Sequence, residues 1–213
     1  MKNLPTLKLE IDLWKKGYVV VGIDEVGRGS FAGPLVVGAV IFSPTTSEKR
    51  IAKLQSLGIN DSKKLLPKKR ELLTKIIQEE CLSHQIEYVS YDIINDIGIG
   101  NALKIGFKNI AKQVLLKLPK TKLFFLTDAY KIQGIDNNLQ LNILRGDATS
   151  LSIAAASIVA KVDRDNHMVE MSKLYPDYGF EKHKGYGTLF HRIKLREHGK
   201  CPIHRTEFIK NHI

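Results

Sequence analysis

The sequence predicts an α/β fold in which a mixed sheet is covered by helices, and two observations predict it. Apolar strand-like runs and amphipathic helix-like runs alternate along the chain, with no internal repeat and no Pro/Gly/Ser-rich linker between them. The first two strand-like runs are separated only by the turn-rich segment GSFAGP, which is short enough to join an antiparallel pair. Residues 1–213 are therefore expected to form a single domain.

The expected strands are short apolar runs bounded by turn residues. They lie at residues 18–23, 35–42, 87–91, 123–127 and 139–144. The expected helices carry apolar residues at helical spacing, and the first of them has Pro67 in a first-turn position. These helices lie at residues 66–81, about 94–118 and about 148–171, the last of them rich in alanine.

Composition and charge narrow the class of function. A chain of 213 residues with 43% hydrophobic content is long enough to bury a core, so disorder is excluded. The 33 Lys and Arg outnumber the 22 Asp and Glu, and this basic balance favours a polyanionic partner such as nucleic acid. Cys81 and Cys201 lack CxxC spacing, so we expect reduced thiols. Because no signal pattern or membrane-length apolar stretch is present, the sequence predicts a soluble cytoplasmic protein.

The run GIDEVGRG sets Asp24 and Glu25 at the end of an apolar strand and follows them with Arg28 between two glycines. This grouping places metal-binding charge beside a phosphate-binding loop. Successive strand residues point to opposite faces, so the strand is expected to end or bulge if both carboxylates serve one site. On this run alone, an exposed acidic turn at the end of the strand is the alternative.

Two more aspartates follow later strands. Asp128 comes directly after the run LFFLT, and Asp147 precedes the alanine-rich helix. The carboxyl ends of neighbouring strands form the usual ligand crevice of an open α/β sheet, which allows Asp24, Asp128 and Asp147 to converge. Such carboxylates suit Mg²⁺ or Mn²⁺. A turn residue is the alternative for Asp128, and a helix N-cap is the alternative for Asp147.

Five blocks of the sequence closely resemble the ribonuclease HII family and follow that family's order from Val20 to Phe208. They are GIDEVGRGSFAGP, NDSKKL at 60–65, the strand end at Asp128, GDATSLSIAAASIVAKVDRD at 146–165 and YPDYGFEKHKGYGT at 175–188. Ribonuclease HIII is the nearest relative, but it usually has lysine in place of Arg28 and carries an additional N-terminal domain. Here about twenty residues precede the first strand, which favours HII.

The chain departs from the family pattern at four places. Ser30 stands where proline is more usual, Ala129 where glycine commonly follows the third acidic residue, and Asp163 where threonine is frequent. The segment HRTEF at 204–208 replaces the usual HRxSF, so no role is carried over to Glu207. None of these departures removes an expected metal ligand.

The resemblance implies a ribonuclease H-like, mixed five-stranded sheet flanked by helices, with a basic helical substrate-binding extension over about residues 175–213. It implies an endonuclease that hydrolyses the RNA strand of RNA/DNA hybrids and cuts on the 5′ side of ribonucleotides embedded in duplex DNA. The products carry 3′-hydroxyl and 5′-phosphate ends. The implied catalytic residues, which are also the ligands of two Mn²⁺ or Mg²⁺ ions, are Asp24, Glu25, Asp128 and Asp147.

Substrate contacts are expected outside the carboxylates, in a protein that we expect to be a monomer. The expected contacts are Gly27, Arg28, Gly29, Lys63, Lys64, Lys184 and Tyr186. The glycines allow the backbone to approach a sugar and its 2′-hydroxyl closely. The ring of Tyr186 is expected to pack on the deoxyribose after the ribonucleotide, and a structural tyrosine in a Gly-Tyr-Gly turn is the alternative. For the lysines, the alternative is solvated surface charge.

Two functions from other classes remain open on the sequence. A non-catalytic nucleic-acid binder explains the net charge of +11, but it leaves the acidic residues adverse to a polyanion. A hydrolase of small phosphates requires a nucleotide cradle, and no GxxxxGK[ST] motif is present. His183 is left out of the catalytic set as a surface or structural histidine. Ser150 and Ser152 are assigned local hydrogen bonding or packing, because no histidine partner lies near them in the sequence.

Overall fold

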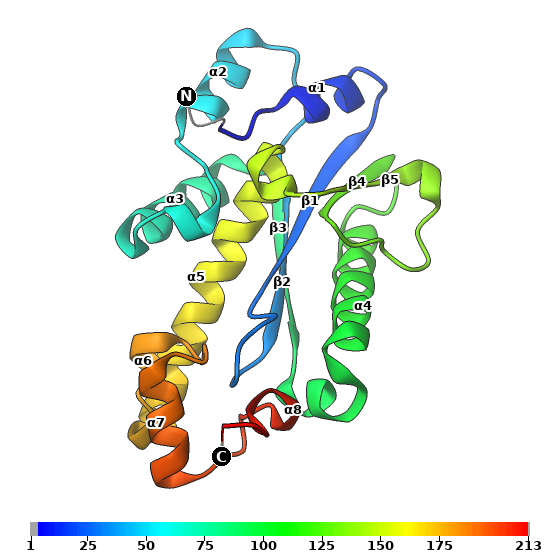
Figure 1. The fold of residues 1–213 in the computed structure, drawn as a ribbon. Coiled ribbons are helices and arrows are strands. Elements are labelled where there is room, and N and C mark those ends of the chain that lie inside the picture. Colours follow the sequence, from blue (N-terminus) through cyan, green and yellow to red (C-terminus); the bar gives the residue numbers. More distant parts are fainter. Residues whose placement is uncertain (1–3, 213) are drawn as a thin grey trace.

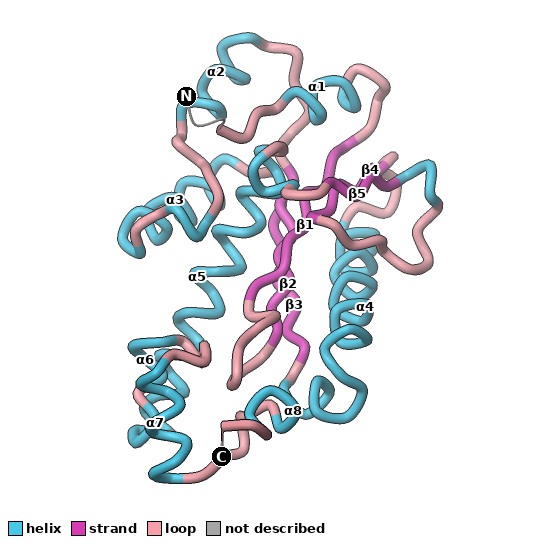
Figure 2. Tube along the Cα trace, viewed as in Figure 1, coloured by secondary structure: helices cyan, strands magenta, loops and turns pink. Residues whose placement is uncertain are grey.

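A computed structural model describes residues 4–212 of the chain, which form a five-stranded mixed sheet flanked by helices. The strand order is β3-β2-β1-β4-β5 (Figures 1 and 2). The strands are β1 (Val19–Val26), β2 (Leu35–Ile41), β3 (Ser83–Val89), β4 (Leu123–Asp128) and β5 (Gln140–Ile143). β1, β2 and β3 pair antiparallel, whereas β4 runs parallel to both β1 and β5. The predicted mixed sheet is confirmed.

The helices lie on both faces of the sheet and beyond one end of it. They are α1 (Lys8–Trp14), α2 (Glu48–Ser56), α3 (Pro67–Glu80), α4 (Tyr91–Lys117), α5 (Leu151–Leu174), α6 (Phe180–His183), α7 (Leu189–His198) and α8 (Thr206–Ile209). Short 3₁₀ turns are η1 (Ser62–Lys64), η2 (Asn137–Leu139), η3 (Gly146–Ala148) and η4 (Pro176–Tyr178). Figure 1 shows α5 and α4 on opposite sides of the strands. Within residues 4–212, no helix has the length and apolarity that crossing a membrane requires.

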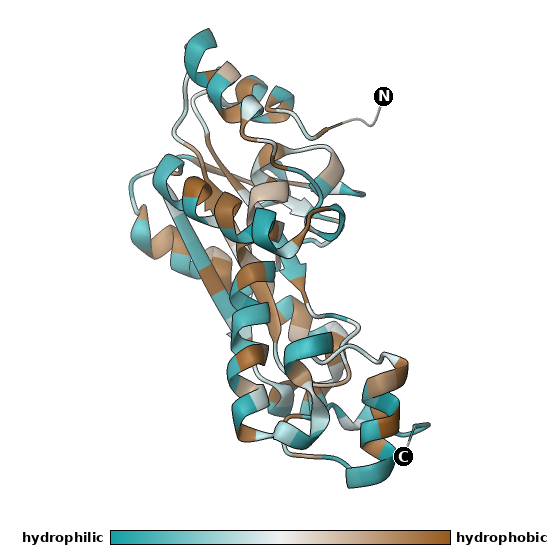
Figure 3. Ribbon diagram, turned by 90° about the vertical axis from the view of Figure 1, so that its left-hand side faces the viewer, coloured by the Kyte–Doolittle hydropathy of each residue, from teal (hydrophilic) through white to brown (hydrophobic). Residues whose placement is uncertain are grey.

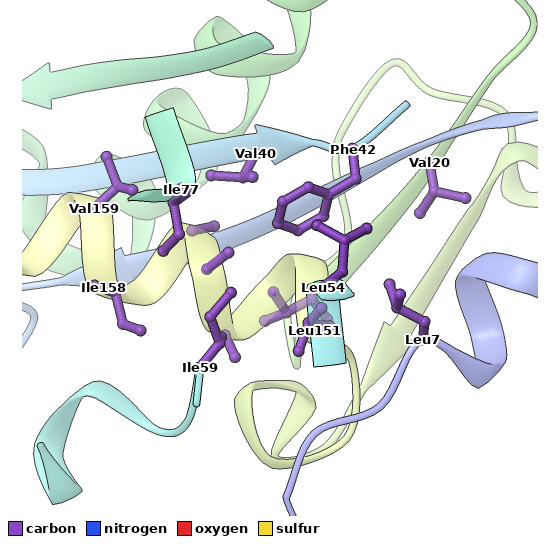
Figure 4. Packing of buried hydrophobic residues seen from close by; sticks show 14 of the residues in the cluster. Leu7, Val20, Val40, Phe42, Leu54, Ile59, Ile77, Leu151, Ile158 and Val159 are labelled. Atoms are coloured by element: carbon purple, nitrogen blue, oxygen red, sulfur yellow. The ribbon is translucent and has the colours of Figure 1, made fainter. Parts of the chain in front are cut away.

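Close packing between α5 and the sheet depends on small residues. A Cβ atom on Gly22 would lie 2.2 Å from the backbone of Ser152, and one on Gly38 would lie 2.6 Å from the Ala156 carbonyl oxygen. The alanine-rich stretch of α5 therefore lies directly on β1 and β2. Figure 4 shows Val20, Val40 and Phe42 packed with residues of α5 and neighbouring helices. On the other face, Val21 and Ile23 pack against α4.

Hydropathy follows this layering. Figure 3 shows hydrophobic segments along the strands and the adjoining turns of α5, while hydrophilic residues are prominent on the outlying helices. A separate cluster joins the end of α5 to the C-terminal helices, with Met168, Phe180, Leu195 and Ile209 at its centre. The predicted helical C-terminal region is confirmed, and it is attached to the rest of the molecule through this cluster.

Three predicted boundaries were wrong. The third strand lies at Ser83–Val89, earlier than residues 87–91, and Tyr91 already begins α4 because the Ser90 hydroxyl accepts the amide of Ile93. Gly98, with φ of 76°, interrupts that helix near its start. The alanine-rich helix begins at Leu151, after η3, because Ser150 is its N-cap.

Candidate active site

A pocket of about 320 Å³ lies at the carboxyl ends of β1 and β4, where the two parallel strands leave the sheet. It is lined by Glu25, Val26, Gly27, Arg28, Gly29, Ser62, Lys63, Asp128, Ser157, Lys161 and Tyr186. Most of these residues belong to the segments singled out in the sequence. The crevice expected at adjacent strand ends is therefore present.

Asp24 and Glu25 both belong to β1, whose pairing with β2 runs unbroken to Val26. The sequence required the strand to end or bulge there if both carboxylates serve one site; no bulge is present at these two residues, and the strand ends one residue after Glu25. Asp24 lies on the face covered by α5 and pairs with Gly38, whereas Glu25 lies on the opposite face. Glu25 lines the pocket. Asp24 does not line it, but its carboxyl group is close enough to Asp128 and Asp147 to be affected by their charges.

The two carboxyl groups of β1 are held in surroundings that disfavour their charge. Burial raises the pKa of Asp24 to about 7, with the charges of Asp128 and Asp147 adding to this effect and a hydrogen bond from Ser157 opposing it. Burial, followed by the charges of Asp24 and Asp128, raises the pKa of Glu25 to about 8. Asp24 Oδ1 accepts the amide of Glu25 at 2.8 Å. Without a cation, the four carboxylates repel one another.

Asp128 and Asp147 come to the same region from different segments. Asp128 is the last residue of β4, and its Oδ1 accepts the amide of Gly146 at 2.8 Å, which ties η3 to the strand end. Asp147 lies inside η3. Burial, together with the charges of Asp61 and Asp128, raises the pKa of Asp147. The N-cap alternative for Asp147 was wrong, because Ser150 has that position.

The donor set suits a hard divalent cation. It consists of carboxylate oxygens only, and Glu25 Oε2 is buried without a hydrogen-bond partner in the described part of the chain. Cations would favour the charged forms of Asp24 and Glu25, which burial and, after it, the neighbouring carboxylates disfavour. Among residues 4–212, no three Asp, Glu, His or Cys side chains already stand together as a complete ligand set. The carboxylates are therefore neighbours, but their ligand geometry is not preformed.

The glycine-arginine-glycine element and Tyr186 lie on the same pocket. Ser30 and Tyr186 form an antiparallel backbone bridge, which holds the loop after β1 beside the loop that carries Tyr186. The Tyr186 side chain is half-buried, and the Arg28 guanidinium lies 5.3 Å from the ring centroid of Tyr130. The structure thus brings Gly27, Arg28, Gly29 and Tyr186 together, although they are about 160 residues apart.

The three predicted lysines do not share one environment. Lys63 lines the pocket, while the Lys64 ammonium pairs with Asp61 Oδ2 at 3.1 Å. Lys184 has a left-handed backbone, and its ammonium donates to the Glu181 carbonyl. It lines a neighbouring pocket of about 360 Å³, together with Lys161, Lys182 and Tyr186. Tyr186 and Lys161 border both pockets, so Lys184 lies beyond Tyr186 and outside the carboxylate pocket.

Sequence reasoning missed two residues of α5 that line the carboxylate pocket. Ser157 and Lys161 are four residues apart, so they lie on one face of the helix. The Lys161 ammonium pairs with Asp165 at 2.7 Å and lies 5.1 Å from the ring centroid of Tyr186. Their spacing is visible in the sequence, but the packing of α5 on the sheet decides that this face meets the end of β1.

The three residues that were left out of the site, Ser150, Ser152 and His183, are buried in structural surroundings. Ser150 caps α5 and donates its hydroxyl to the buried Glu10 carboxylate at 2.6 Å, which also accepts the Ser152 amide at 2.9 Å. His183 is buried, and its Nε2 lies 2.9 Å from the Tyr178 carbonyl oxygen. Their assignment to local structural roles is confirmed.

The mixed sheet, with carboxylates at the ends of two adjacent parallel strands, defines the ribonuclease H-like class of fold. The model of the family described as Ribonuclease HII matches residues 21–211. Ribonuclease HII of Caldicellulosiruptor bescii is 42% identical, covering 96% of this chain and 93% of its own. Ribonuclease HII of Endomicrobium trichonymphae is 46% identical, and the match covers 92% of this chain and 89% of the relative. A chain of the PCNA:RNase HII complex from Archaeoglobus fulgidus superposes with a TM-score of 0.70 at 26% identity, covering 90% and 94%.

The chain therefore belongs to the ribonuclease HII family. Members of this family are metal-dependent endoribonucleases that cleave the RNA strand of RNA/DNA hybrids. The choice of HII over HIII, to which Arg28 contributed, is confirmed. The two alternatives from other classes, a non-catalytic binder and a hydrolase of small phosphates, are excluded by this membership.

Proposed function

We propose that this endonuclease also cuts on the 5′ side of single ribonucleotides embedded in duplex DNA, leaving 3′-hydroxyl and 5′-phosphate ends. One observation carries the proposal. A single pocket is lined by carboxylates from β1 and β4, by the Gly27–Gly29 loop and by the ring of Tyr186. Groups suited to hydrolysis, to recognition of a ribose and to contact with the next sugar therefore border the same space.

Asp24, Glu25, Asp128 and Asp147 are the proposed ligands of two divalent ions, Mg²⁺ or Mn²⁺. Asp24 is the proposed shared ligand, since the charges of both Asp128 and Asp147 add to the effect of burial in raising its pKa. Bound ions of this kind position water, offset phosphate charge and stabilise the leaving oxygen. The chain's own contribution is to hold four carboxylates close together at the ends of β1 and β4 and in η3.

Selection of a ribonucleotide is assigned to the loop and the tyrosine. The Gly27–Gly29 backbone has no side chain at two of its three positions, which allows close approach to a 2′-hydroxyl. The Tyr186 ring is proposed to pack on the following deoxyribose, which would favour an RNA-to-DNA step over continuous RNA. Its half-buried position at the border of two pockets supports this role.

Basic residues are proposed to hold the duplex. Lys63, which lines the carboxylate pocket, is proposed to meet the nearest phosphate. Lys184, in the neighbouring pocket, and Lys64 are proposed to meet phosphates further along the strand. The C-terminal extension from about residue 175 is proposed as a second wall, because residues 181–213 contain eight Lys or Arg and three acidic residues. A single domain, a monomeric state and a cytoplasmic location stay predictions.

Cleavage mapping tests the proposal. Four duplexes of one sequence would contain no ribonucleotide, one, four, or a full RNA strand, and each would be incubated with Mg²⁺, with Mn²⁺ and with EDTA. We expect one cut on the 5′ side of the single ribonucleotide, a 5′-phosphate on the downstream product and no cleavage in EDTA. Cleavage of the full hybrid without cleavage at the single ribonucleotide would contradict the proposal.

A further inference from the structure

Two arginines, Arg164 in α5 and Arg205 before α8, are completely buried, although neither forms an ion pair in residues 4–212. Their guanidinium groups donate only to backbone carbonyls. A buried cation with neutral partners is costly, and apolar residues of similar volume often stabilise such a position better. Stability alone therefore does not account for this pair, and the carbonyls that they bind indicate another role.

All but one of those carbonyls belong to the loop after β1. Arg205 donates to the carbonyl of Gly33 at 2.9 Å, and its Nη1 donates to those of Gly27 at 2.7 Å and Arg28 at 3.1 Å. Arg164 donates to Pro34 at 2.9 Å and Ala32 at 3.1 Å. The loop 27–34 is thus held through its carbonyl oxygens from two sides.

Arg164 also connects this loop to the one that carries Tyr186. Its Nη1 donates to the Lys184 carbonyl at 2.9 Å, and its guanidinium lies 5.3 Å from the ring centroid of Tyr186. A Cβ atom on Gly27 would lie 2.2 Å from Arg164 Nε, so the arginine packs directly under the glycine. The two loops therefore share one rigid support.

The amide groups of the loop, unlike its carbonyl groups, do not bind the two arginines. The amides of Phe31 and Ala32 donate to the Gly185 carbonyl, and the amide of Gly33 donates to that of Ile203. Within residues 4–212, the amides of Arg28 and Gly29 have no protein acceptor. Arg205 binds the carbonyls of Gly27 and Arg28, and these carbonyls share their peptide units with the amides of Arg28 and Gly29, so the two amides are held in place with their hydrogens free for a ligand.

We infer that Arg164 and Arg205, here called the arginine clamp, are positioning residues that fix the amides of Arg28 and Gly29 relative to Tyr186 for ribonucleotide recognition. The inference rests on the proposed function of the same pocket. Lysine in place of either arginine keeps the charge but cannot reach several carbonyls with one planar group. We therefore expect either lysine variant to lose selectivity for the ribonucleotide and to retain general duplex binding.

The test compares Arg205→Lys and Arg164→Lys with a matched control, Tyr178→Phe. The control removes the bond from the Tyr178 hydroxyl to the Gly199 carbonyl, 3.1 Å long, and this bond involves neither arginine of the clamp nor a residue of the loop 27–34. Two quantities are measured for each variant. One is amide hydrogen exchange in residues 27–33, and the other is affinity in EDTA for a duplex with one ribonucleotide and for the same duplex in DNA only.

We expect about tenfold faster exchange at Phe31, Ala32 and Gly33 in both lysine variants, with exchange in β4 unchanged. The preference for the ribonucleotide duplex should fall about tenfold, while affinity for the DNA duplex stays within about twofold of the parent protein. If one lysine variant does not fold, the other variant alone tests the inference, because the two arginines bind different carbonyls.

Unchanged exchange in residues 27–33 would overturn the inference. The inference would also be overturned if the lysine variants lost affinity equally for both duplexes and Tyr178→Phe showed the same losses, since these losses would indicate general destabilisation. A parent protein without any preference for the ribonucleotide duplex would instead overturn the proposed function. Hydrogen exchange would then still decide whether the clamp holds the loop.

Discussion

The ring of His191 lies with its Nδ1 3.0 Å from the carbonyl oxygen of Tyr186, and this contact belongs to a buried chain of hydrogen bonds. His191 Nε2 and His204 Nε2 are 3.0 Å apart, and His204 Nδ1 accepts the amide of Cys201 at 2.9 Å. These partners require both rings to be neutral, with His204 donating to His191 and His191 donating to Tyr186. The backbone at Tyr186 therefore depends on two uncharged histidines.

Acid should weaken the fold through these rings. Burial, with a smaller contribution from His183, lowers the pKa of His191 to about 3, and burial lowers that of His204 to about 4. Between pH 6.5 and pH 4 each ring binds a proton in the unfolded chain but not in the folded chain, so the contribution of the two rings to the free energy of unfolding falls as pH is lowered. The raised pKa values of Asp24 and Glu25 contribute in the opposite direction, so the effect of the rings is read from the difference between parent and variant. Each histidine contributes at most about 1.4 kcal/mol per pH unit.

Urea unfolding at several pH values measures this slope. His191→Gln retains a donor but cannot take up a proton, so it should reduce the loss of stability between pH 6.5 and pH 4.5. The matched control is His198→Gln, at a side chain that is 37% exposed, and it should keep the parent slope. Equal slopes for the parent protein and His191→Gln would contradict the prediction.

Tyr186→Ala should separate the two substrates. If the ring packs on the deoxyribose after the ribonucleotide, kcat/KM on a duplex with one embedded ribonucleotide should fall roughly tenfold to hundredfold, as expected for about 1 to 3 kcal/mol of stacking. Activity on a long RNA/DNA hybrid should fall much less. Tyr186→Phe should retain most of the activity, because the flat ring makes the contact. Equal losses on both substrates would give Tyr186 a purely structural role.

Asp24→Asn should abolish cleavage and leave hybrid binding intact or slightly stronger. The change removes a proposed shared metal ligand and one buried charge among carboxylates that repel it, so the melting temperature without divalent ions should be equal to or higher than that of the parent. Divalent ions should raise the parent's melting temperature but have little effect on the variant. More than about 1% residual activity would remove Asp24 from the central role.

Asp128→Asn and Asp147→Asn should each lower activity and raise the metal concentration needed for half-maximal rate. Asp128 also accepts the Gly146 amide, a bond that the asparagine carbonyl can keep, so Asp128→Asn should retain the tie between β4 and η3. Titration of Mg²⁺ at saturating substrate measures the shift, which we expect to be about tenfold or more. An unchanged metal requirement for either variant would remove that aspartate from the ligand set.

Ala129→Gly should stabilise the protein. Ala129 follows Asp128 with φ of 60°, a left-handed conformation that costs a non-glycine residue about 1 kcal/mol or more. The melting temperature should rise by a few degrees, as expected for about 1 kcal/mol. Ala52→Gly, at an exposed site within α2, is the matched control and should lower stability by about the same amount. A lower melting temperature for Ala129→Gly would contradict the prediction.

Ala129 shows why some departures from the family pattern can be explained only when the backbone conformation is known. The replacement of glycine by Ala129 is visible in the sequence, but its cost depends on a backbone angle. Likewise, the serine that caps α5 is Ser150, three residues after Asp147, and both residue types are good caps. The sequence could not choose between them, because the choice depends on the 3₁₀ turn that Asp128 holds against β4.

The sequence by itself determined the mixed sheet, the family and the four carboxylates as candidates. Apolar runs, helical spacing and motif order are local properties, and they survive any error of a few residues in the boundaries. Only the tertiary structure decided that Asp24 and Glu25 lie on opposite faces of an unbroken strand, that Lys184 lies beyond Tyr186, and that Lys161 joins the pocket. The physical reason is that these relationships depend on how α5 and the C-terminal helices pack on the end of the sheet, which brings together residues distant in the chain.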